Sequence, residues 1–139
     1  MKYLTSILFF FTITSIGFAQ KVNLVTYFDA GFQDKELVIS WTVSNPKDIS
    51  NFKIEKRQSS EGEFTNVCEV PFSNFRKKSE TDSVTYFTYV CSDKPTENGV
   101  YFFSLKMIDN KGKELASPQL LKIGINEISE FKLKQNNPN

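Results

Sequence analysis

Apolar and polar residues alternate in short runs along most of this chain, which is the period expected for β-strands that bury one face. The cleanest alternation spans residues 36–43. A strand with this pattern packs one face on a core. No window of ten or more residues keeps a helical period, so an all-β domain is predicted. The apolar face of the clearest strand carries Leu37, Ile39, Trp41 and Val43.

Turn-forming residues divide the rest of the chain into further short strands. Strands are predicted at residues 22–28, 36–43, 52–55, 64–72, 84–91, 100–109 and 115–125. Residues 30–35 are expected to turn the chain, and the polar run 73–83 is expected to form a long surface connection. Pro71 and Pro118 indicate that their strands end there or lie at a sheet edge.

About seven strands at this spacing, in a domain of roughly 100 residues, are typical of an antiparallel Greek-key β-sandwich. Trp41 is expected to fill the space between the two sheets. A small barrel or a jelly roll is the alternative all-β architecture.

The N-terminus has the three parts of a cleaved secretory signal. Lys2 supplies a positive charge, an apolar run follows, and Gly17 and Ala19 place small residues two apart. We therefore predict a signal peptide at residues 1–19 and a mature domain at 20–125 that begins with Gln20. The alternative is a membrane anchor, but the run is shorter than a span needs and is interrupted by polar residues, so no stable membrane span is expected.

Charge and cysteine content restrict the partners and the redox state. The chain carries 17 Lys and Arg against 16 Asp and Glu, and removal of Lys2 with the signal makes the mature protein formally neutral. Nucleic acid is therefore not an expected partner, because phosphate recognition uses a clustered basic excess. Cys68 and Cys91 form an even pair in an exported chain, so they either form a disulfide or remain two buried thiols.

The residues offer no recognisable catalytic chemistry. The chain has no histidine, which excludes the common nucleophile–base sites and most zinc sites. Its carboxylates are scattered, so no pair stands out for glycoside hydrolysis. The run 109–114 has a passing likeness to a calcium loop, but it reads more simply as a hairpin turn. No enzyme activity, catalytic residue, metal or cofactor is predicted.

Three aromatic residues are candidates for a binding surface. Phe72 and Phe75 lie in or beside the polar connection, and Tyr86 has the opposite parity to the other aromatic residues of its strand. Packing in the core or at an edge is the alternative use for each of them. If they are exposed together, the domain is a cell-surface binding module of the adhesin or carbohydrate-binding kind.

Three stretches carry a resemblance to a known family: LVISWT at 37–42, NFKIEKRQSSEGEF at 51–64 and FFSLKMIDNKGK at 102–113. Together they resemble the fibronectin type III-like module that precedes the C-terminal sorting domain in many exported proteins of Bacteroidota. Lys56 stands where that family commonly has arginine, and Phe102-Phe103 replaces a tyrosine pair. The resemblance covers most of the mature chain and implies an immunoglobulin/fibronectin type III-like β-sandwich.

The last residues extend the resemblance. FKLKQNNPN at 131–139 looks like the opening of the type A sorting domain that the type IX secretion machinery recognises, with Asn137 in place of a tyrosine. Residues 126–139 are therefore predicted to be a linker and the incomplete start of that domain. An ordinary Asn- and Pro-rich terminus is the alternative interpretation.

These observations together predict a monomeric, exported and non-catalytic spacer or accessory module. The resemblance implies the type IX machinery as a partner if the sorting domain is complete. The expected location is the periplasm, or the cell surface and medium when a complete sorting domain is present.

Overall fold

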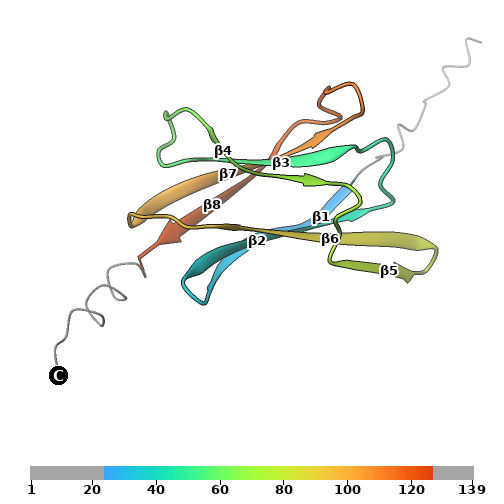
Figure 1. Ribbon diagram of the computed structural model, residues 1–139, viewed down its shortest axis with the longest axis horizontal. Helices are drawn as coiled ribbons and strands as arrows, with labels where there is room; N and C mark the ends of the chain where they lie inside the picture. The colour runs from blue at the N-terminus through green and yellow to red at the C-terminus, as the bar shows by residue number, and fades with distance from the viewer. Residues whose placement is uncertain (1–23, 127–139) are drawn as a thin grey trace, which may run out of the picture.

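The structure is a computed structural model that describes residues 24–126 and consists of β-strands joined by turns and loops (Figure 1). Eight strands form two four-stranded antiparallel sheets. The strands are β1 (Leu24–Gln33), β2 (Glu36–Ser44), β3 (Asn51–Arg57), β4 (Thr65–Pro71), β5 (Lys77–Thr81), β6 (Val84–Asp93), β7 (Gly99–Ile108) and β8 (Gln119–Ile125).

The sheets have the orders β1-β2-β6-β5 and β4-β3-β7-β8, which we call sheet A and sheet B. The chain crosses between them after β2, after β4 and after β6, and it makes hairpins elsewhere. Figure 1 shows the sheets as two layers, with sheet B above sheet A. The predicted all-β sandwich is confirmed, and the two separate sheets exclude a closed barrel.

Strand β5 corrects the predicted count of seven strands, because it lies inside the polar run 73–83 that was expected to be a surface connection. It pairs only with β6 and is therefore an edge strand. Asp82 and Ser83, with φ of 50° and 63°, form the two-residue turn into β6. The side chains of β5 are mostly exposed, so the strand is held by backbone pairing with β6. Its sequence therefore shows no alternation of apolar and polar residues.

The first hairpin also differs from the prediction. Strand β1 continues through residues 30–33, which were expected to turn, and the turn consists of Asp34 and Lys35 alone. Both residues have positive φ, 50° and 69°, as two-residue hairpin turns require. The longer strand places Phe32 opposite Leu37, on the core side of the sheet.

The core lies between the two sheets and centres on three aromatic rings. Trp41 on β2, Phe52 on β3 and Tyr89 on β6 are each fully buried. The ring centroid of Trp41 lies 5.6 Å from that of Phe52 and 5.7 Å from that of Tyr89, and the last two are 4.4 Å apart. Trp41 therefore contacts both sheets, as the alternation along β2 predicts.

Tyr101 secures the crossover from β6 to β7. Its hydroxyl donates a hydrogen bond of 2.7 Å to the backbone carbonyl of Glu97, four residues upstream. Burial raises the pKa of Tyr101, so the hydroxyl remains a donor at neutral pH. A tyrosine at the start of this strand that bonds back to the preceding loop is a recurrent feature of immunoglobulin-like sandwiches.

Candidate functional site

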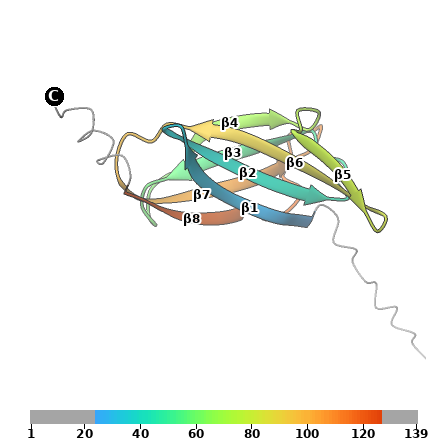
Figure 2. The same ribbon diagram turned by 90° about the horizontal axis from the view of Figure 1, so that it is seen from below.

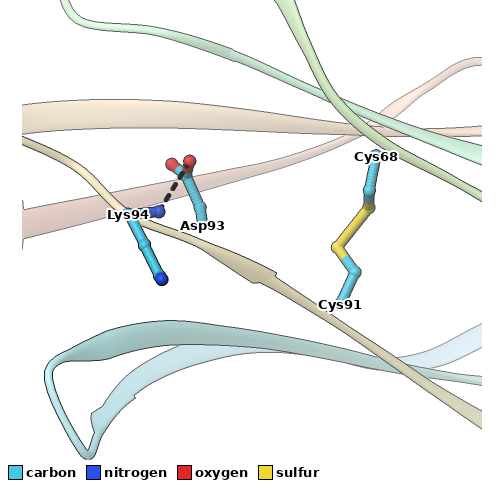
Figure 3. Close-up of a disulfide and its surroundings, with 4 residues drawn as sticks. All are labelled: Cys68, Cys91, Asp93 and Lys94. Carbon is cyan, nitrogen blue, oxygen red and sulfur yellow. Dashed lines mark hydrogen bonds between the residues drawn. A yellow bond between two sulfur atoms is a disulfide. The ribbon is translucent and has the colours of Figure 1, made fainter.

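A disulfide between Cys68 and Cys91 joins the two sheets (Figure 3). Cys68 lies on β4, at one edge of sheet B, and Cys91 lies on β6 of sheet A. Their Cα atoms are 6.7 Å apart and their sequence separation is 23. The bond therefore closes the side of the sandwich where β4 approaches β6.

Two polar contacts continue this link at the neighbouring inward positions of β6. The hydroxyl of Tyr89 donates to the carbonyl of Phe72 at 2.8 Å, on the crossover that follows β4. The carboxylate of Asp93 lies 2.7 Å from the ammonium of Lys56 on β3, and both side chains are largely buried. Residues 89, 91 and 93 thus each bind β6 to the opposite half of the sandwich.

The outer face of sheet B carries an ion network around Glu55. The Glu55 carboxylate lies 3.2 Å from Lys53 and 2.9 Å from Lys106, which also lies 3.4 Å from Glu114. Glu55 is 9% exposed. Burial raises the pKa of its carboxyl, but the ammonium groups of Lys106 and Lys53 outweigh this effect and hold the pKa below the ordinary value of 4.5.

We expect Glu55→Gln to lower the free energy of unfolding by about 1–2 kcal/mol at pH 7, because it removes a charged acceptor from two lysines. The pKa of Glu55 is lower in the folded state, so its contribution is present above pH 4.5 and disappears as the pH falls through the folded-state pKa. Urea unfolding at pH 7 and at pH 3 measures both effects.

Glu69 provides the matched control for this variant. It is an exposed carboxylate on the neighbouring strand β4, opposite Lys53. Glu69→Gln should change stability by no more than about 0.5 kcal/mol at either pH. If Glu55→Gln lowered the free energy of unfolding as much at pH 3 as at pH 7, the charge of Glu55 would not be the cause of the loss.

The structure separates the three aromatic candidates. Phe72 and Phe75 both pack on the ring of Phe87, with centroid distances of 5.2 Å and 5.0 Å. Phe72 is half-buried against the core, whereas Phe75 is 39% exposed. Tyr86 is half-buried and precedes Phe87, so it lies on the opposite face of sheet A. The three residues therefore do not form one continuous surface.

The carboxylate of Asp109 is used by its own turn. Its Oδ1 accepts hydrogen bonds from the backbone N–H groups of Lys111, at 2.8 Å, and Lys113, at 2.9 Å. The Lys113 N–H, more than any other group, holds the pKa of Asp109 below its ordinary value. Gly112 adopts a φ of 80° in the same turn. This geometry is that of a hairpin loop, and residues 24–126 contain no group of three His, Cys, Asp or Glu placed to hold a metal ion.

The sequence reasoning did not select Arg57, at the end of β3. Its guanidinium carbon lies 4.6 Å from the ring centroid of Phe64 and 5.4 Å from that of Phe102 on β7. Arg57 also borders a cavity of about 470 Å³ between the β3–β4 and β6–β7 loops. The sequence pattern that could have pointed to this residue is the basic pair Lys56-Arg57, followed by the aromatic residue Phe64.

The predicted signal peptide and the predicted sorting segment after Asn126 lie outside the described residues. Between residues 24 and 126, the structure contains no helix of the length and apolarity that crossing a membrane requires. No family model matches the chain, and no curated protein matches it either.

Proposed function

We propose that this chain is an exported, non-catalytic, fibronectin type III-like module that acts as a spacer or accessory domain beside a type IX sorting signal. The three stretches that carry the resemblance fall mainly on β2, on β3 with the loop that follows it, and on β7. These are central strands of the two sheets. The tyrosine at the start of β7 adds a structural feature of the same class of sandwich.

The observation that carries the spacer proposal is the position of the first and last strands. Strand β1 begins at one end of the long axis and β8 ends at the other (Figures 1 and 2). A segment that precedes the domain and a segment that follows it are therefore held apart by the length of the sandwich. This arrangement suits a module that keeps a sorting signal at one end of the sandwich, away from the mature N-terminus at the other.

The links along β6 support the same proposal. A spacer has to stay folded outside the cytoplasm, where disulfides persist. The disulfide at Cys91, the ion pair at Asp93 and the hydrogen bond of Tyr89 hold the two sheets together at three successive inward positions. Stability of this kind does not depend on a ligand or a cofactor.

Fractionation of a Bacteroidota host with an active type IX system tests this proposal. We expect the given chain to lose its signal, to begin at Gln20 and to accumulate in the periplasm. The same chain with a complete type A sorting domain fused after Asn139 should appear on the cell surface or in the medium. The comparison measures N-terminal sequence and location for both proteins.

Two outcomes would contradict the proposal. Retention of the chain in the cytoplasm would contradict the prediction that residues 1–19 are an export signal. Appearance of the given chain at the surface at the level of the fusion protein would mean that its export does not need the added sorting domain.

A further inference from the structure

A cavity with a polar lining lies at one end of the sandwich, between the β3–β4 and β6–β7 loops. Its volume of about 470 Å³ falls within the range of roughly 300–1,000 Å³ that small-molecule sites occupy. Its walls come from the end of β3, the start of β4 and the β6–β7 loop. The neutral and acidic polar groups in the lining are Gln58, Glu63, Thr65, Thr96 and Glu97.

Arg57 is the cation of this lining that has no carboxylate within 4 Å among residues 24–126. The other two, Lys56 and Lys94, are paired with Asp93 at 2.7 Å and with Glu36 at 3.2 Å. The guanidinium of Arg57 instead contacts the rings of Phe64 and Phe102, and its Nε atom is buried without a hydrogen-bond partner.

This arrangement prepares the guanidinium to bind an anion. Contacts with two aromatic rings restrict the side chain, so less side-chain entropy remains to be lost on binding. A guanidinium presents its N–H donors in the plane as a fork that matches a carboxylate. Unlike Lys56 and Lys94, which are paired with carboxylates, Arg57 therefore combines a restricted orientation with an unpaired charge.

We propose that this cavity binds an acidic sugar, a hexuronate unit, with Arg57 donating to its carboxylate. The hydroxyl groups of such a unit would bind the carboxylates of Glu63 and Glu97, the amide of Gln58 and the hydroxyls of Thr65 and Thr96. A densely sulfated or phosphorylated polymer fits less well, because the lining offers it Arg57 as a single unpaired cation against many negative charges. An acidic peptide fits less well, because Tyr101, the aromatic residue of the lining, is 5% exposed and offers no apolar subsite.

The test is a titration of the mature chain with a galacturonate trisaccharide, followed by ¹H–¹⁵N NMR. The neutral galactose trisaccharide is the matched ligand control. The chain has two arginines, so its two Nε–H signals can be assigned with the Arg76→Gln variant. We expect the acidic sugar to shift the Arg57 Nε–H and the amides of the cavity lining, and the neutral sugar to shift neither.

Arg57→Gln should weaken binding of the acidic trisaccharide at least about tenfold, because it removes a charge-assisted hydrogen-bond pair. Arg76→Gln is the matched control, since it removes the same charge from an exposed position outside the cavity, and binding should change less than twofold. Gln58→Ala tests the site without disturbing the stack on Phe64 and Phe102. It should weaken binding several-fold with an unchanged melting temperature.

Three results would overturn the proposal. In the first, the acidic sugar does not shift the Arg57 Nε–H signal. In the second, the neutral trisaccharide binds as tightly as the acidic one. In the third, Arg76→Gln weakens binding as much as Arg57→Gln. None of them bears on the spacer proposal, which fractionation tests separately.

Discussion

Replacing Trp41 with alanine is expected to lower the free energy of unfolding by about 3–5 kcal/mol. The indole is fully buried between the sheets and contacts the rings of Phe52 and Tyr89, so its removal leaves a large cavity that rigid sheets cannot close. This loss is a large share of the roughly 5–15 kcal/mol that stabilises a typical domain. Urea unfolding followed by circular dichroism measures it.

Two further variants test whether the lost volume of the indole causes the destabilisation expected for Trp41→Ala. Trp41→Phe keeps much of the ring and removes an Nε1 group that has no hydrogen-bond partner, so its cost should be less than half that of alanine. Tyr27→Ala removes a ring that is 50% exposed, and it should cost at most about 1 kcal/mol. An unchanged urea midpoint for Trp41→Ala would contradict the assignment of β2 to the core.

The second large effect is expected from the disulfide. Replacing both Cys68 and Cys91 with alanine should lower the free energy of unfolding by about 3 kcal/mol, because the bond closes a loop of sequence separation 23 in the unfolded chain. Reduction of the wild-type protein should lower it by a similar amount.

Thiol titration under denaturant, applied to the mature chain expressed in an oxidising compartment of a host cell, identifies the bond. We expect no reactive thiol before reduction and two after it. The double alanine variant is the control for effects of the reductant itself. Adding reductant should not change the free energy of unfolding of this variant. Two free thiols before reduction would contradict the disulfide between Cys68 and Cys91 and the stabilisation that we assign to it.

The sequence alone was sufficient for the strands that bury one face. Strands β2 and β7 alternate apolar and polar residues over most of their length, so the fold class and the burial of Trp41 follow from the residues themselves. Pro71 and Pro118 predict a strand end or a sheet edge in the same way, and Pro71 is the last residue of the edge strand β4 while Pro118 directly precedes the edge strand β8. Such features are local, because the period of a strand and the missing N–H of proline act within a few residues.

Features that depend on pairing and packing needed the tertiary structure. Strand β5 has no apolar period and exists because β6 offers it a hydrogen-bonding edge. The separation of Tyr86 from Phe72 and Phe75 depends on which face of sheet A each side chain occupies.

The two sites that we describe depend on the same kind of information. Cys68 and Cys91 have a spacing that is compatible with a bond or with two thiols, and the approach of β4 to β6 decides between them. Arg57 has an unpaired charge because its guanidinium packs on Phe64 and Phe102 and has no carboxylate within 4 Å among residues 24–126. Contacts between residues far apart in the chain follow from how the sheets pack, which no local pattern of residues records.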